Sequence, residues 1–129
     1  MITFRNSAHR EFFKHYAEED RDVYRRALIY TLGICEDTRD RLSELYNVDK
    51  QSITPESINA GWQTSGSMRV TRLAFNLFTD NTVTAILDDR KDYDECRQYS
   101  VSDIFCCEHA PYFVQAIRIR YSEFFRGMD

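Results

Sequence analysis

Glycine and proline are scarce in this sequence, which contains only four Gly and two Pro among 129 residues. So few turn-forming residues argue against a β architecture rich in tight turns, and also against a disordered chain. No apolar run approaches the ~20 residues that a membrane-spanning helix requires. The N-terminus also lacks the basic and apolar segments of a secretion signal. We therefore expect a cytoplasmic protein that has no membrane partner.

Lysine is also rare, because 14 of the 17 basic residues are Arg. Acidic residues outnumber basic ones, and the formal net charge is −4. A sequence-independent grip on nucleic acid normally needs a basic surface, so this balance argues against a nucleic-acid partner. Arg suits bidentate contacts with carboxylates or phosphates and also protein interfaces. Plain surface ion pairs are its commoner use, so the composition alone selects no partner.

The four cysteines, Cys35, Cys96, Cys106 and Cys107, show no familiar metal or disulfide pattern. Adjacent cysteines are poorly placed to bond each other, and zinc sites usually space paired ligands by two to four residues. A zinc site drawn from the last three cysteines and His109 therefore has little support. We expect reduced thiols, with Cys106 and Cys107 acting as small core residues. The sequence predicts no metal and no other cofactor.

Apolar residues are abundant: hydrophobic residues make up 43% of the chain and aromatic residues 14%. Such a chain can bury a core without disulfides or metal, so one domain over residues 1–129 is expected. The predicted fold is all-α, a single compact domain of five or six short helices. Three helices are expected near 7–18, 20–32 and 36–46, and a fourth within the stretch that ends at 78. A short helix should follow Ser100 or Ser102, and the last should lie near 111–121. One further helical turn is expected at 54–57.

The second helix should be the most central element together with the fourth, because residues 27–32 are apolar almost all round. Gly33 is expected to end the second helix in the left-handed conformation. The inward faces of the first and last helices are predicted to be Ala8, Phe12, Phe13 and Tyr16, and Phe113, Ala116, Ile117 and Tyr121. Three polar residues are then expected at the surface: His9, His15 and Arg118.

Acidic residues crowd into the segment 80–99. Asp88, Asp89, Asp92, Asp94 and Glu95 outnumber the two basic residues among them. The charge pattern predicts an exposed and mobile acidic segment, and a solvated loop is favoured over a mimic of phosphate charge. Residues 82–87 fit either a short strand or a further helical turn.

The stretch 61–78 joins a loop of small polar residues to the clearest amphipathic pattern in the chain. One apolar stripe recurs at i, i+3, i+4, i+7 and i+8: Val70, Leu73, Ala74, Leu77 and Phe78. Ser65 or Ser67 can cap this helix, whose free N–H groups attract anions. A phosphate, carboxylate or nucleotide could bind the residues around its start: Trp62, Gln63, Thr64, Ser65, Arg69 and Arg72. In the alternative interpretation, Trp62 fills the core, the serines only cap, and the arginines pair with acidic neighbours.

No catalytic signature accompanies this stretch. Nucleophilic catalysis needs Ser or Cys beside a positioned His, and no G-x-S-x-G elbow occurs. Gly61 and Gly66 lack the lysine of a phosphate-binding P-loop, and no G-x-G-x-x-G motif follows a predicted strand. We therefore expect a protein without enzymatic activity.

Residues 20–46 weakly match a DNA-binding helix-turn-helix. Its turn would fall at Gly33, but Ile29 stands where a small residue is usual and Arg39 where a buried aliphatic residue is usual. Acidic side chains also alternate with the arginines of the second helix, which would face phosphates unfavourably. A plain pair of packed helices is the favoured interpretation.

Motifs spread along the chain match the pattern of one protein family. They are Phe4-x-Asn6-x-x-His9, Tyr24-Arg25-Arg26-Ala27-x-x-Tyr30-Thr31-x-Gly33-Ile34, Gly61-Trp62-Gln63-Thr64-Ser65-Gly66 leading into Arg69-Val70-x-Arg72-Leu73-Ala74-Phe75-Asn76-Leu77, and Ala110-Pro111-Tyr112-Phe113-x-x-Ala116-Ile117-Arg118-x-Arg120-Tyr121. The chain thereby resembles an uncharacterised family of small proteins from bacterial phages and other mobile elements. The resemblance covers nearly everything outside 80–99. It implies no activity, cofactor or catalytic residue, but an intracellular setting in a bacterial host.

Three functions are compatible with these observations. The first is an interaction protein of a phage or mobile element, for example an anti-defence inhibitor that binds a host protein. The second is a small-molecule or nucleotide-binding protein that sequesters an anionic ligand at the 61–72 loop and helix start. The third is a DNA-binding regulator that uses residues 20–46. A host protein is the partner we expect first, and nucleic acid last.

Overall fold

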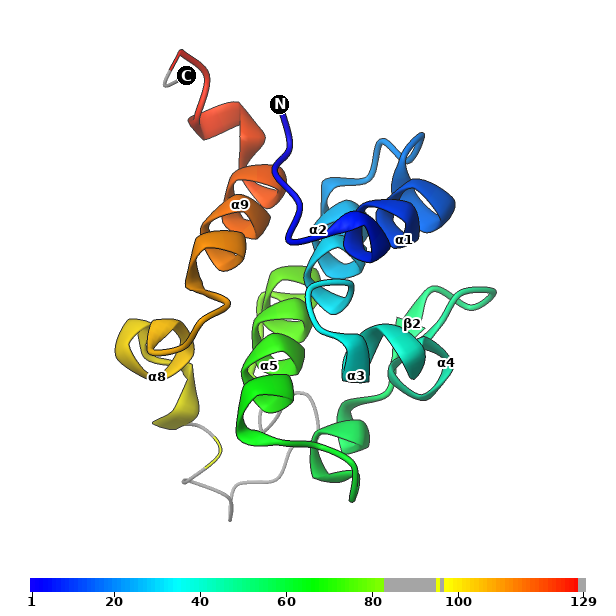
Figure 1. Ribbon diagram of the computed structural model, residues 1–129, viewed down its shortest axis with the longest axis vertical. Helices are drawn as coiled ribbons and strands as arrows, with labels where there is room; N and C mark the ends of the chain where they lie inside the picture. Colours follow the sequence, from blue (N-terminus) through cyan, green and yellow to red (C-terminus); the bar gives the residue numbers. More distant parts are fainter. Residues whose placement is uncertain (83–94, 96, 128–129) are drawn as a thin grey trace.

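The computed structural model describes residues 1–82, 95 and 97–127, and these are mostly helical, as predicted. Its described part contains seven α-helices rather than five or six, four of them longer than two turns (Figure 1). The helices are α1 (Ser7–Ala17), α2 (Val23–Leu32), α3 (Glu36–Asp40), α4 (Leu42–Leu45), α5 (Ser65–Thr79), α8 (Val101–Phe105) and α9 (Ala110–Arg120). Three 3-10 turns add η1 (Pro55–Asn59), η2 (Arg97–Tyr99) and η3 (Ser122–Phe124).

A small antiparallel hairpin, which no pattern in the sequence indicated, interrupts the helices. Strand β1 (Tyr46–Asn47) pairs with β2 (Ser52–Ile53), with Tyr46 opposite Ile53. The turn between them passes through Gln51, whose φ of 53° lies in the left-handed region. The hairpin is too short to show the alternation by which strands are found in a sequence.

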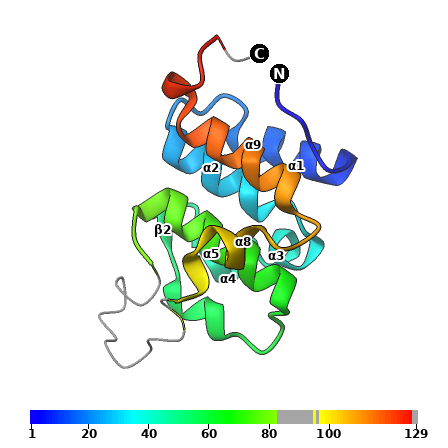
Figure 2. The ribbon, with the colours of Figure 1, turned by 90° about the vertical axis from the view of Figure 1, so that its left-hand side faces the viewer.

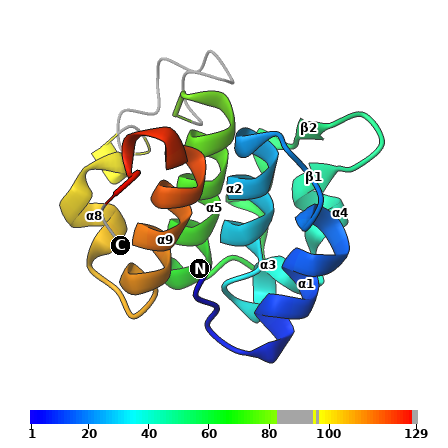
Figure 3. The same cartoon turned by 90° about the horizontal axis from the view of Figure 1, so that it is seen from above.

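Helix α2 lies at the centre, packed against α1, α5 and α9 (Figures 1 and 3). All six residues from Ala27 to Leu32 are buried, as their apolar run predicted. Helix α5 is its most extensive neighbour, in agreement with the expectation that the second and fourth helices lie at the centre. Helix α8 packs on α5 and α9, and Figure 2 shows it crossing in front of α5.

Gly33 ends α2, but not in the predicted left-handed conformation. Its φ is −77°, within the right-handed helical region. A Cβ at this position would lie 2.7 Å from Cδ2 of Phe12 and 2.9 Å from Cδ2 of His9. The glycine is therefore needed because α1 passes closely over the end of α2, and its conformational freedom is not used.

The buried face of α1 differs from the predicted one. Phe12 and Phe13 are buried as expected, but Ala8 is exposed and Tyr16 is 39% exposed. His9, predicted at the surface, is completely buried. Its Nε2 donates to the backbone oxygen of Tyr30 at 2.7 Å, so the core accommodates this polar ring through a hydrogen bond that a hydropathy pattern cannot reveal.

The buried face of α9 also differs from the predicted one. Phe113 and Ala116 are buried as predicted, whereas Ile117 and Tyr121 are only half-buried. The buried stripe continues instead through Ile119 and the charged Arg120, and Arg118, predicted to be exposed, is half-buried.

Two further expectations need correction. The helix predicted over 36–46 is broken at Arg41 into α3 and α4, although Leu42, Leu45 and Tyr46 face inward as expected. Cys106, predicted as a core residue, is exposed, while Cys107 is half-buried. Residues 83–94 lie outside the described residues, and with them most of the predicted acidic segment and of the alternatives for 82–87. Cys96 also lies outside the described residues. Within the described part, no helix is long and apolar enough to cross a membrane.

Candidate functional site

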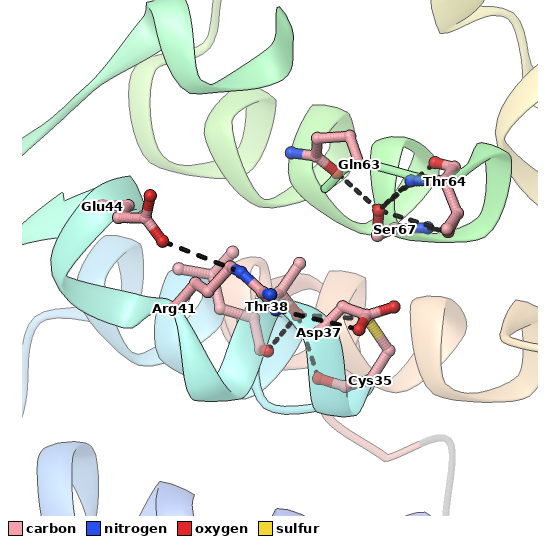
Figure 4. Close-up of polar contacts among 9 residues, drawn as sticks. Cys35, Asp37, Thr38, Arg41, Glu44, Gln63, Thr64 and Ser67 are labelled. Carbon is pink, nitrogen blue, oxygen red and sulfur yellow. Dashed lines mark hydrogen bonds and ion pairs between the residues drawn. The ribbon is translucent and has the colours of Figure 1, made fainter. Parts of the chain in front are cut away.

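The loop before α5 is closed by hydrogen bonds among its own side chains (Figure 4). The N-cap is Thr64 rather than Ser65 or Ser67, and its Oγ1 accepts from the Ser67 N–H at 3.1 Å. Ser67 Oγ in turn accepts from the Thr64 N–H at 2.7 Å, which completes a reciprocal capping box. Gln63 accepts from the Ser67 hydroxyl and donates to Ser57 O and Thr71 Oγ1. These groups hold the loop in place, and their bonding capacity is used within the chain.

Trp62 is half-buried against the core and stacks with a cation from α3–α4. The Cζ atom of Arg41 lies 4.9 Å from the indole centroid, within the range of a cation–π contact. Arg41 also approaches Asp37 and Glu44 at 3.9 and 3.8 Å (Figure 4). The indole Nε1 is buried and has no hydrogen-bond partner within the described chain. Trp62 therefore braces the loop against α4 through its ring.

The two arginines of the predicted anion site lie on α5 and are bonded to the chain itself. Arg72 donates from Nε and Nη2 to the two carboxylate oxygens of Glu95, both at 2.8 Å. These two side chains are only 12% and 11% exposed. Arg69 donates from Nε to the backbone oxygen of Asp103 at 2.9 Å, which links α5 to α8. Glu95, predicted to belong to a solvated acidic segment, is instead largely buried in an ion pair.

Of the six residues predicted to form this site, Trp62, Gln63, Thr64 and Ser65 lie at the start of α5, and Arg69 and Arg72 lie one and two turns further along the same helix. Thr64 and Ser65 are exposed there, and Gln63 and Trp62 are half-buried. A Cβ at Gly66 would lie 3.7 Å from Nε2 of His109, so the base of α9 packs against this helix start. As in the alternative interpretation, Ser67 takes part in the cap and Arg72 pairs with an acidic residue, whereas Trp62 is half-buried and does not fill the core.

A polar cluster that no motif in the sequence indicated joins the N-terminal segment to α1 and α9. Arg5 donates from its backbone N–H to His9 Nδ1 at 3.1 Å, and from Nη1 to Ile34 O at 3.2 Å. The same Nη1 lies 3.4 Å from His109 Nδ1. Burial lowers the pKa of His9 from 6.5 to about 4, and burial also lowers the pKa of His109. His9 is thus a neutral core residue that is completely buried.

Arg120 is a second buried polar residue that the hydrophobic pattern missed. Its Nε donates to Leu77 O at 3.0 Å and its Nη2 to Asp80 Oδ1 at 3.2 Å. The guanidinium carbon lies 3.5 Å from the ring centroid of Tyr24 and 4.6 Å from that of Tyr121. Arg120 therefore connects α9 to the end of α5 and the start of α2, and its role is structural.

Two adjoining grooves, the basic groove pair, run along the segment Met1–Arg5. The groove against α1 has a volume of about 630 Å³, and the groove against α9 and the C-terminal turn about 330 Å³. Both are lined by Met1, Ile2 and Arg26. Their cationic wall residues are Arg10, Lys14, Arg26, Arg118 and Arg126, and Glu18 is the carboxylate among the lining residues. These cations are dispersed in the sequence, and only the i, i+4 spacing of Arg10 and Lys14 hinted at a shared face.

Metal binding finds no support in the described residues. In residues 1–82, 95 and 97–127, no group of three or more His, Cys, Asp or Glu side chains could hold an ion. Cys96, one of the four residues weighed for zinc, lies outside this part of the chain.

Comparison with known families gives a match over the full length, residues 1–129, to the family described as Family of unknown function (DUF6075). The chain belongs to this family. Searches of curated proteins and of solved structures give no significant match. Membership of the family agrees with the resemblance to an uncharacterised family, and it supplies no activity.

Proposed function

We propose that this DUF6075 protein acts by binding another protein and has no catalysis of its own. The basic groove pair carries the proposal, because it offers open apolar surface flanked by cations. Arg10 and Lys14 on its wall are exposed and form no side-chain hydrogen bond or ion pair within the described chain. Interfaces commonly combine such an apolar centre with a polar rim.

The resemblance to proteins of phages and mobile elements suggests where the partner is found. A small accessory protein of this kind would act in the cytoplasm of a bacterial host. We propose a host protein as its partner, for example a component of a defence system that this chain inhibits.

The small-molecule alternative has weaker support. Its strongest feature is the exposed pair Thr64 and Ser65 at the start of a 15-residue helix. Against it, the Arg72 guanidinium already forms a bidentate pair with Glu95, and any anion would have to compete with that carboxylate. The DNA-binding alternative has less support still. The helix that would have to enter the major groove of DNA is broken into α3 and α4, which have only five and four residues.

Affinity capture from host lysate tests the proposal. A tagged chain should retain one host protein reproducibly, identified by mass spectrometry, and the purified pair should re-form a complex. A parallel thermal-shift series with nucleotides should leave the melting temperature unchanged. A nucleotide-dependent rise that Arg72→Gln abolishes, with no protein retained, would favour the small-molecule alternative instead.

A further inference from the structure

We infer that the basic groove pair binds an acidic segment of the partner protein whose carboxylates alternate with apolar side chains. This inference rests on the proposed function and names the surface and the chemistry of the partner. It follows from three features of the grooves, which are their charge, their apolar floor and the fixed position of their central cation.

The charge of the grooves opposes that of the whole chain. The chain carries a formal net charge of −4, yet among the described residues five cationic side chains and one carboxylate line the two grooves. Other exposed acidic residues lie outside the groove lining. Glu11, Glu19 and Glu123 are near it in sequence, whereas Asp37, Asp40, Glu44 and Asp49 are on α3, α4 and the β1–β2 turn. A segment bearing carboxylates is therefore attracted to one face and repelled from another, which gives both orientation and specificity.

Arg10 and Lys14 are the cations most available to such a segment. They stand four residues apart on α1, so they share one face of the helix. Like charges at this spacing repel, and no carboxylate of the described chain pairs with either side chain. A partner carboxylate between them would remove that repulsion and gain charge-assisted hydrogen bonds.

The floor between the cations is apolar. Ile2 and Phe4 are half-buried and Phe13 is buried beneath the larger groove. The smaller groove is lined by Ile119 and Phe125. Apolar side chains that alternate with acidic ones would reach this floor while the carboxylates meet the walls.

Arg26 lines both grooves, and its guanidinium is held by bonds within the chain. Its Nη1 donates to the backbone oxygens of Ala17, Glu18 and Asp20, and its guanidinium carbon lies 5.1 Å from the Phe13 ring centroid. A cation fixed in this way loses little side-chain entropy when a ligand arrives. Arg26 therefore keeps its position in the lining of both grooves before any partner binds.

These features favour an acidic protein segment over nucleic acid. A nucleic-acid backbone would place a long polyanion against a chain of net negative charge. An acidic protein segment is short, and it supplies the apolar side chains that the floor can bury.

Fluorescence anisotropy on the full chain tests the inference. The probe is a short labelled peptide in which Asp and Glu alternate with Leu and Phe, and the comparison probes are a Lys/Arg peptide of the same apolar content and a DNA duplex. The Arg10→Glu, Lys14→Glu double variant should bind the acidic peptide at least about tenfold more weakly than the unmodified chain. The Arg21→Glu, Lys50→Glu variant changes the net charge equally at exposed positions outside the grooves and should remain within about twofold.

The inference would be overturned by equal weakening in both double variants, or by tighter binding of the duplex or the basic peptide than of the acidic one. No binding of the acidic peptide would also overturn it. Circular dichroism of each variant verifies that the helices persist, since all four positions are exposed. Failure of the proposed function looks different: the unmodified chain would then retain no host protein. A host protein retained equally by both double variants would leave the proposed function standing and remove the groove assignment.

Discussion

His9 is a buried base whose protonation opposes folding. Its ring is completely enclosed, its Nδ1 accepts from Arg5 N–H, and the cations of Arg5 and Arg39 add to the effect of burial. The pKa in the folded chain is about 4, below the ordinary value of 6.5, so the unfolded chain binds the proton more readily. This penalty is absent above about pH 6.5 and grows as the pH falls towards 4.

We expect the free energy of unfolding to decrease by up to roughly 3 kcal/mol over that window because of His9. Urea denaturation at a series of pH values measures the decrease. His9→Gln should flatten it, and His15→Gln, at an exposed position on the same helix, should leave it unchanged. His109 also lowers the free energy of unfolding as the pH falls, because its pKa is lowered too. It does so equally in the unmodified chain, in His9→Gln and in His15→Gln. An unaltered pH slope in His9→Gln would contradict the burial of this ring.

Gly33 allows a second test at the residue scale. Gly33→Ala should destabilise the chain by about 1–3 kcal/mol, because the new methyl group overlaps Phe12 in a packed region. Gly61→Ala is the matched control, since nothing lies within 4 Å of a Cβ built there. Thermal denaturation of the control should differ from the unmodified chain by less than about 0.5 kcal/mol. Stabilisation by Gly33→Ala would show that α1 does not pass so closely over α2.

Helix α5 is tied to Glu95 by a bidentate ion pair with little exposure. A double-mutant cycle with Arg72→Gln and Glu95→Gln should give a coupling energy of roughly 1–3 kcal/mol. The same cycle on Arg41 and Asp37, which are more exposed and 3.9 Å apart, should give less than about 0.5 kcal/mol. Urea denaturation supplies all the values. Equal coupling in the two cycles would mean that the Arg72 pair is solvated in solution.

Element by element, apolar periodicity located the helices better than it located their faces. The stripe from Val70 to Leu77 predicted α5 because almost every inward position is apolar. On α1 and α9 the inward face includes His9 and Arg120, which a hydropathy pattern assigns to solvent. Their burial depends on acceptors supplied by other elements, such as Tyr30 O and Leu77 O, and these are invisible to a local pattern.

The candidate sites also differ in how far they could be predicted from local sequence. The bonds among Gln63, Thr64 and Ser67 join residues within one turn of each other, so a capping role could be foreseen. The partner of Arg72 lies 23 residues further along the chain, and spacing alone gave no means to select it. The basic groove pair is assembled from the N-terminal segment, α1, α2 and α9, so it emerges only when those elements are packed.

At the scale of the whole molecule, α2 connects the remaining long helices, since α1, α5 and α9 all pack against it. Arg120 reinforces this arrangement by bonding to the last turn and the C-cap of α5 while stacking on Tyr24 of α2. Because α1, α5 and α9 share α2 as their packing partner, they should not unfold separately. We therefore expect the chain to unfold in a single cooperative transition.

Two spectroscopic probes distinguish this outcome. Trp62 is the only tryptophan and reports on the loop braced by Arg41, whereas far-ultraviolet circular dichroism reports on all helices. The two denaturation curves should coincide in the unmodified chain. They should shift together in Arg120→Met, which removes the buried charge and leaves Leu77 O without its donor, at a cost of roughly 2–4 kcal/mol. A tryptophan transition that stays in place while the dichroism transition moves would show that the loop side of α5 folds independently of the helices around α2.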